Sequence, residues 1–139
     1  MSNVFRRYHR PTGNEYWDNA MEIEKLLVPF LMNTKNVPKG YRYIYAVPTL
    51  NDLKKMQNCI VTAKTIYPTT DELVEQKKAA YYRAVCACEQ VIQDLQRMVL
   101  ILPIDIDKLD HIGELLLKES ALLRDCRKKV KVQVYKNEQ

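Results

Sequence analysis

The sequence predicts an all-α protein, an antiparallel up-down-up-down bundle of four helices. Apolar residues recur at three- and four-residue spacing in four separate segments. Prolines and capping residues divide these segments, and none of them alternates with the two-residue period of a strand. Because the connections are short, consecutive helices are expected to lie side by side in opposite directions. The chain has 139 residues, 47% of them apolar, which suits one domain with one core.

The first predicted helix begins at Asn14 and carries its apolar stripe to Leu31. Asparagine is a favourable capping residue at a helix start. Pro29 falls inside the stripe and is expected to bend the last turns.

The second predicted helix runs from about Pro48 to Tyr67, after a connection at residues 37–40. Proline is well tolerated in the first turn of a helix. It also disfavours a helical conformation at the residue before it, so the sequence leaves the conformation of residues 41–47 open.

The third predicted helix has the clearest start in the sequence. Thr69 and Glu72 match a capping box, in which the hydroxyl and the carboxylate satisfy free backbone amides. The helix is expected to reach about Leu102, a length of roughly 45 Å at 1.5 Å per residue, where a proline ends it. A fourth helix follows, capped by Asp105 or Asp107.

Positive charge is concentrated away from the helical stripes, although the net charge is only +5. Residues 1–13 and 33–51 contain no acidic residue and carry +3 each, and residues 124–139 carry +4. We therefore divide the chain into a basic N-terminal arm (1–13), the bundle (14–128) and a basic C-terminal tail (129–139). The tail alternates like a strand without an obvious partner, so we expect a flexible end or one that a partner orders.

Aromatic residues interleave with basic ones at residues 5–10 and 39–45. This combination suits nucleic acid, because cations neutralise phosphates while rings stack on bases of any identity. The alternative is that the basic segments only keep the protein soluble. Charge alone selects these candidate nucleic-acid contacts: Arg6, Arg7, Arg10, Lys39, Arg42, Arg127, Lys128, Lys129 and Lys131.

Residues 79–88 predict a subunit interface. Only Arg83 is charged there, and the other nine residues are apolar around the whole circumference of the helix. A helix that is apolar all round is usually buried all round, which exceeds what one bundle is expected to bury. The alternative is that exposed alanines simply favour a helix. The predicted interface residues are Ala80, Tyr81, Ala84, Ala87 and Cys88.

The sequence shows no catalytic or metal-binding pattern. Neither His9 nor His111 has an acidic or cysteine partner at the spacing of metal ligands. Cys86 and Cys88 would face different ways on a helix, so they are not expected to chelate one ion. No nucleophile elbow or phosphate-binding glycine loop is present. We therefore expect no catalysis, no cofactor and no metal.

The longest apolar run, at residues 98–104, is too short to span a membrane. No apolar stretch follows the basic residues 1–12, so no signal peptide is expected. These observations favour a cytoplasmic protein whose four cysteines are free thiols.

Three junctions carry a resemblance to a known family. These are the segment 37–43, the segment 66–73, and 95–98 leading into 102–105. They resemble the four-helix-bundle proteins related to the accessory variability determinant of diversity-generating retroelements. The intervening-sequence proteins encoded within large-subunit ribosomal RNA genes belong to the same group. The resemblance covers about residues 14–130 and rests on helix order and junction motifs.

The resemblance implies a homopentameric barrel of four-helix protomers with a basic surface. Such an assembly binds nucleic acid and a partner reverse transcriptase, and supports complementary-DNA synthesis from a template RNA during mutagenic retrohoming. The positively charged residues of the family match this chain at Lys39, Arg42, Arg83 and Arg97.

The sequence thus predicts a non-catalytic, oligomeric accessory protein that binds RNA or DNA mainly through phosphates. A bundle that binds only protein, as an adaptor, is the first alternative. An enzyme with an unrecognised site is the second, and it would require a polar, metal-bearing cavity inside the bundle.

Overall fold

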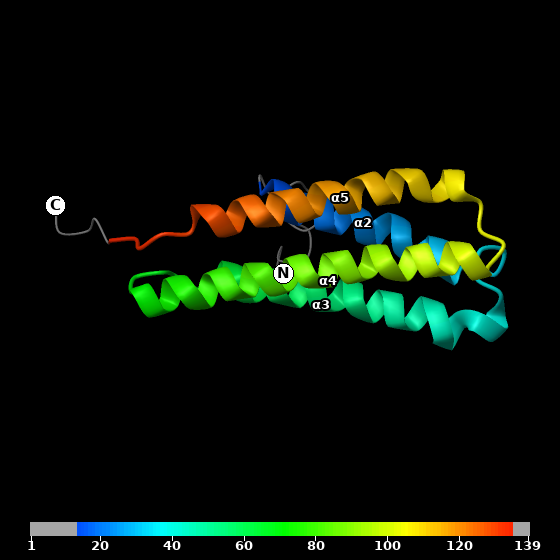
Figure 1. The fold of residues 1–139 in the computed structure, drawn as a ribbon, viewed down its shortest axis with the longest axis horizontal. Coiled ribbons are helices and arrows are strands. Elements are labelled where there is room, and N and C mark those ends of the chain that lie inside the picture. The colour runs from blue at the N-terminus through cyan, green and yellow to red at the C-terminus, as the bar shows by residue number, and fades with distance from the viewer. Residues whose placement is uncertain (1–13, 135–139) are drawn as a thin grey trace, which may run out of the picture.

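The computed structural model describes residues 14–134, and this part of the chain contains four long helices and no strand (Figure 1). The predicted all-helical architecture with four helices is confirmed. None of the described helices is long and apolar enough to cross a membrane. The helices are α2 (Glu15–Met32), α3 (Val47–Thr65), α4 (Asp71–Ile101) and α5 (Ile106–Lys129), and a 3₁₀ turn η1 (Lys39–Tyr41) and a π-helical turn η2 (Arg42–Ala46) precede α3.

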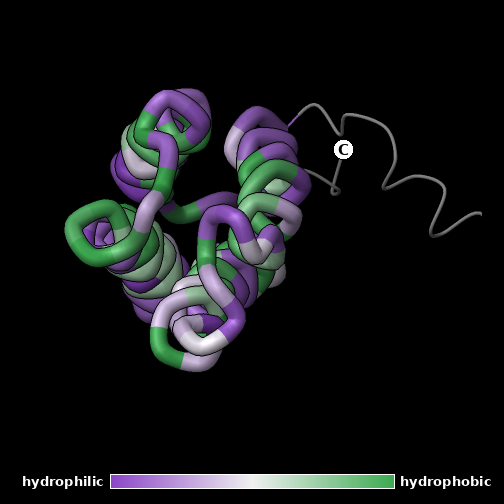
Figure 2. The backbone as a smooth tube through the Cα atoms, turned by 90° about the vertical axis from the view of Figure 1, so that its right-hand side faces the viewer, coloured by the Kyte–Doolittle hydropathy of each residue, from purple (hydrophilic) through white to green (hydrophobic). Residues whose placement is uncertain are grey.

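The helices lie alongside one another, and their three connections alternate between the two ends of the bundle (Figure 1). The most extensive contact joins α3 and α4, followed by that between α4 and α5. In contrast, α2 packs chiefly on α5 and touches α3 little. Seen from one end, the four helices surround a shared interior (Figure 2). Of the four, α4 has the most extensive contacts with its neighbours.

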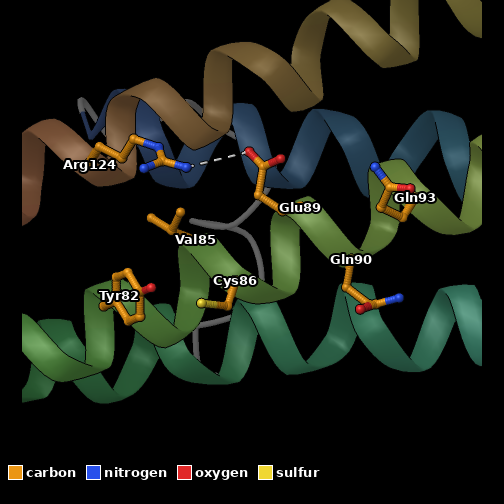
Figure 3. Close-up of a pocket in the computed structure, with 7 residues that line it drawn as sticks. All are labelled: Tyr82, Val85, Cys86, Glu89, Gln90, Gln93 and Arg124. Carbon is orange, nitrogen blue, oxygen red and sulfur yellow. Dashed lines mark ion pairs between the residues drawn. The ribbon is translucent and has the colours of Figure 1, made fainter.

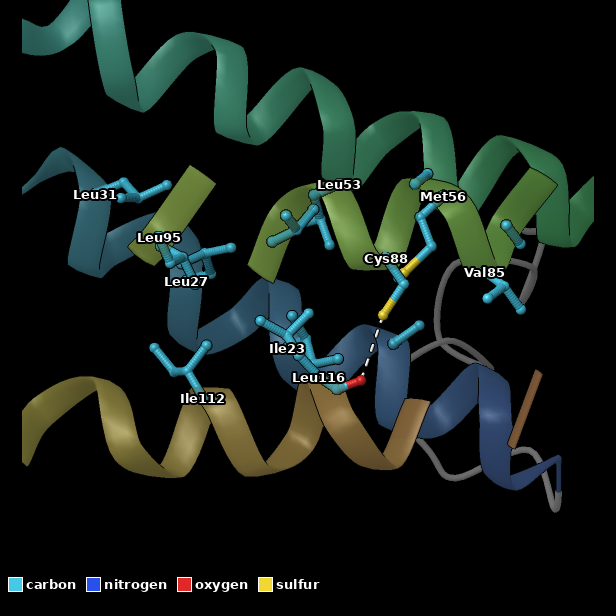
Figure 4. Close-up of a cluster of buried hydrophobic side chains, with 14 of the residues drawn as sticks. Ile23, Leu27, Leu31, Leu53, Met56, Val85, Cys88, Leu95, Ile112 and Leu116 are labelled. Atoms are coloured by element: carbon cyan, nitrogen blue, oxygen red, sulfur yellow. Dashed lines mark hydrogen bonds between the residues drawn. The ribbon is translucent and has the colours of Figure 1, made fainter. Parts of the chain in front are cut away.

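The interior is a continuous cluster of buried side chains to which every helix contributes (Figure 4). Complete burial of a valine, leucine, isoleucine or methionine side chain contributes roughly 1.5–3 kcal/mol to the free energy of folding. Among these side chains, the Cys88 thiol donates a hydrogen bond to the carbonyl of Leu116 at 3.3 Å. Completely buried side chains include Ile23, Leu27, Leu31, Met56, Ile60, Val91, Met98, Leu116 and Leu123.

The observed helix starts agree with those predicted from the sequence to within one residue. The cap of α4 is Thr70, whose hydroxyl accepts from the Leu73 amide at 3.1 Å. The prediction of Thr69 as the cap was therefore wrong by one position, because two adjacent threonines offer the same hydroxyl. Asp105 caps α5, where its side chain accepts from the amide of Asp107 at 3.0 Å.

The segment whose conformation the sequence left open is helical. Val47, immediately before Pro48, has φ −63° and ψ −48°, so the proline does not interrupt the chain there. The π-helical turn η2 leads directly into α3. Beside the proline, which lacks an amide proton, the Thr49 hydroxyl donates to the carbonyl of Tyr45 at 2.7 Å and supports this junction.

The described part of the C-terminal tail lies against the bundle. Helix α5 extends one residue beyond the predicted end at Lys128. Val130 packs partly against the core, and the Gln133 amide donates to the carbonyl of Pro68 at 2.9 Å. The strand-like residues up to Val134 therefore run beside the α3–α4 connection.

Candidate nucleic-acid interface

The connection between α2 and α3 is anchored at both sides. Asn36 is buried, and its side-chain amide donates to the carbonyl of Phe30 at the end of α2, at 3.0 Å. Val37 is buried in the core beside it. The Tyr41 amide then donates to the carbonyl of Pro38 at 2.8 Å and closes the η1 turn. These contacts hold the backbone from which the predicted cations project.

Two predicted nucleic-acid contacts belong to this connection. Lys39 is exposed in η1, and Arg42, the first residue of η2, is partly buried. Within residues 14–134 neither of them, nor Lys35, takes part in an ion pair. The Arg42 Nε atom is buried without an acceptor in this part of the chain. Because residues 33–51 contain no acid, the positive charge here is not neutralised locally.

Of the arginines suggested by the resemblance, Arg83 and Arg97 lie at different places on α4. Arg97 lies one turn before the end of α4, at the same end of the bundle as the α2–α3 connection (Figure 1). It is exposed and lies 3.9 Å from Asp94, a distance that makes a weak surface ion pair. Arg83 is 14 residues earlier on the helix, which places it roughly 21 Å away along the axis. The structure therefore groups Arg97, but not Arg83, with the connection.

The C-terminal cations lie at the opposite end of the bundle (Figure 1). Arg127 stacks over the ring of Tyr82, with its guanidinium carbon 5.4 Å from the ring centroid. Lys129 pairs with Asp125 at 2.8 Å. Lys128 and Lys131 are exposed. The predicted contacts Arg6, Arg7 and Arg10 lie outside the described residues.

The predicted subunit-interface residues are instead part of the core of this chain. Helix α4 packs against both α3 and α5, so a wide face of it is covered within one chain. Burial within one chain accounts for the apolar character of all five residues without a second subunit, since each is at most 5% exposed: Ala80, Tyr81, Ala84, Ala87 and Cys88.

Two hollows flank the exposed face of α4. The hollow between α4 and α5 has a volume of about 310 Å³, and its polar wall includes an ion pair of 3.8 Å between Arg124 and Glu89 (Figure 3). Glu89 also accepts from the Ser120 hydroxyl at 2.8 Å. The hollow on the α3 side has about 420 Å³ and is lined by Arg83. Cys86 lines both hollows.

No metal centre is formed within residues 14–134, where no group of three or more histidine, cysteine or acidic side chains gathers. All four cysteines are free. The expected divergence of Cys86 and Cys88 is confirmed, because the first is exposed and the second is completely buried.

Sequence reasoning missed one buried acid. Glu119 is completely buried between α2 and α5, where its Oε1 accepts from the Asn19 amide at 3.0 Å and its Oε2 has no partner. Asn19 also donates to the carbonyl of Leu115 at 2.9 Å. Burial raises the pKa of Glu119 to about 7, although the hydrogen bond from Asn19 opposes this shift. The signal was present, since Glu119 occupies the one gap in the stripe of Ile112, Leu116 and Leu123.

Comparison with known proteins finds no match for this chain among protein-family models, curated proteins or solved structures.

Proposed function

We propose that this chain is a nucleic-acid-binding accessory protein without catalytic activity of its own. In this proposal it assists a reverse transcriptase in making complementary DNA from template RNA in a diversity-generating retroelement. The observation that carries the nucleic-acid part is the acid-free α2–α3 connection, whose cations form no ion pair among the described residues. The reverse-transcriptase part rests on the family resemblance of the junction motifs.

The proposal includes an up-down-up-down helix order, which the alternating connections in Figure 1 support. It also includes a homopentamer, which rests on the resemblance because the apolar stretch of α4 is used inside the chain. In a ring, Lys39 and Arg42 would be repeated by symmetry. A weak phosphate contact would then be multiplied into useful affinity.

The test is a double substitution of the connection, Lys39→Gln with Arg42→Gln. We expect weaker binding to both RNA and DNA and a flatter salt dependence, because fewer counterions are released. Removal of one phosphate contact should reduce the slope of log K against log salt by about 0.7–0.9. Binding curves for wild type and variant across a salt series measure this change.

A matched control removes the same charge elsewhere. Lys25 on α2 and Lys54 on α3 are exposed, and their double glutamine variant should bind like wild type at all but the lowest salt concentrations. Curves of the connection variant that superimpose on those of wild type would mean that the connection is only a solvated turn.

The adaptor alternative has an observation of its own. Leu100, Ile101 and Ile106 are exposed around the α4–α5 connection, at the same end of the bundle. Wild-type protein that binds neither RNA nor DNA at low salt would contradict the proposal and favour an adaptor that docks on protein.

A further inference from the structure

Two tyrosine rings are exposed to solvent beside the cations of the α2–α3 connection. Tyr43 in η2 is 82% exposed, and Tyr41 in η1 is 42% exposed. The rings of Tyr41 and Tyr45 lie 6.2 Å apart and are tilted by 39°, and Tyr45 packs against the core. Tyr41 is therefore braced by a ring that the bundle itself holds in place.

The exposed rings contribute little to folding. Hydrophobic stabilisation follows the apolar area removed from water, and a ring as exposed as Tyr43 removes little. The neighbouring Ile44 is also 62% exposed, so the π-helical turn directs two consecutive large side chains outward. Exposed aromatic residues grouped beside cations indicate a surface that binds a ligand.

The chemistry of this surface distinguishes between forms of nucleic acid. In a duplex the base faces are stacked inside the helix, so a ring that projects from a turn meets only base edges or the backbone. A single strand presents base faces, on which aromatic rings stack with little sequence preference. Lys39 and Arg42, in the same acid-free segment, supply the positive charge that the backbone of such a strand requires.

We propose that the α2–α3 connection binds single-stranded nucleic acid, with unpaired bases stacked on Tyr41 and Tyr43 and a backbone phosphate at Lys39. This inference rests on the proposed nucleic-acid function and adds the form of the strand and the residues that read it. The rings supply affinity for bases of any identity, and the cations supply the dependence on salt.

The experiment compares three fluorescein-labelled probes: an oligothymidylate of about 16 nucleotides, an abasic backbone of the same length and a duplex of the same length. The test variant is Tyr43→Leu, which keeps apolar bulk but removes the ring. Tyr43→Phe is the matched control because it keeps the ring. Circular dichroism and thermal unfolding of both variants verify that the bundle is intact.

Wild type should bind the oligothymidylate more tightly than the abasic strand or the duplex. Tyr43→Leu should weaken binding of the oligothymidylate by about five-fold or more, since stacking on one ring contributes at least that much. It should leave the salt dependence and the binding of the abasic strand unchanged. Tyr43→Phe should bind all three probes like wild type.

Equal affinity of wild type for the oligothymidylate and the abasic strand would overturn the inference. So would a Tyr43→Leu variant that binds the oligothymidylate like wild type. In both cases binding through phosphates, and with it the proposed function, would stand. Wild type that binds none of the three probes would overturn both, and the rings would then be a surface for a protein partner.

Discussion

The α3–α4 pair and the α2–α5 pair are held together in different ways. In the first pair, Leu53, Met56 and Ile60 of α3 are buried, and the facing helix α4 buries small residues such as Ala84 and Ala87. Small side chains let the two helices approach each other closely and stay in contact along most of their length. The interior of this pair is apolar over these residues.

The α2–α5 pair is joined by a buried polar contact. Asn19 bridges the Leu115 carbonyl and the Glu119 carboxyl, and an exposed ion pair of 3.2 Å between Lys118 and Glu15 lies beside it. Buried polar groups contribute less to stability than close apolar packing, but they specify how two helices align. Helix α2 touches α3 little, so its position depends on α5, through this contact and through buried apolar residues such as Ile23 and Leu27. The comparison predicts that α3–α4 determines whether the bundle folds and that the buried Glu119 of α2–α5 adds the largest dependence of stability on pH. Burial and the neighbouring Asp94 also raise the pKa of Asp52, between α3 and α4, to about 6.

The largest effect is expected from Ala84→Glu. Ala84 is completely buried, so the variant would place an unpaired carboxylate in the α3–α4 interior. The cost of several kcal/mol is comparable with the whole free energy of unfolding of a typical domain, so we expect the variant to lose its helical structure. Circular dichroism and urea denaturation measure this loss.

Ala79→Glu makes the same chemical change five residues earlier on α4, where the side chain is exposed. Its free energy of unfolding should stay within about 0.5 kcal/mol of wild type. An Ala84→Glu variant that remains folded and only dissociates from an assembly would restore the subunit-interface interpretation of α4.

The second effect concerns Glu119. Its pKa is about 7 in the folded chain and near 4.5 in the absence of burial. Between these values the folded state retains a proton that the unfolded state has lost. The contribution of Glu119 to the free energy of unfolding therefore falls as the pH rises from 4.5, and this loss is complete above 7.

Glu119→Gln removes this titration. Between pH 4.5 and pH 7, the free energy of unfolding of the variant should rise by about 3 kcal/mol relative to that of wild type. Urea denaturation of both proteins across the window gives the difference. Glu114→Gln, an exposed substitution on the same helix, is the matched control. The prediction would be contradicted if the difference in free energy of unfolding between Glu119→Gln and wild type did not change with pH.

The smallest effect is expected from Lys118→Gln, which removes the exposed ion pair with Glu15. The side chains of both partners are about half or more exposed, so water and salt screen their attraction. The decrease in the free energy of unfolding should not exceed about 1 kcal/mol and should shrink further at high salt. A much larger decrease in the free energy of unfolding would show that the exposed ion pair, rather than the buried Asn19 contact, holds α2 on α5.

Much of the fold was predictable from local signals. Periodic apolar residues, Pro68, Pro103 and the threonines and aspartates at helix starts located all four helices. The conformation before Pro48 was not predictable, because a proline disfavours helix at the preceding residue, whereas here Val47 is helical and the Thr49 hydroxyl donates to the carbonyl of Tyr45.

Burial on α4 was harder to predict, because a stripe of alanines looks the same whether a neighbouring helix or a second chain covers it. Only the packing of α4 against both α3 and α5 identifies Ala80 and Ala84 as core residues. The connection containing Lys39 could be selected from charge alone. Its exposed rings could not, since sequence does not distinguish the exposed Tyr43 from the partly buried Tyr45.

The π-helical turn also lets this connection absorb a change in the length of the chain. A π turn accommodates one more residue than an α-helical turn, and each residue of an α-helix advances the chain by about 100°. Deleting one residue from Arg42–Ala46 would convert the turn into α-helix and leave Lys39 and Tyr41 on the same side of α3, because the turn already absorbs the extra residue. Deleting one residue within α3 would instead rotate Lys39 and Tyr41 about the helix axis by about 100°, and related chains with such a deletion would present the same residues on a different side of the bundle.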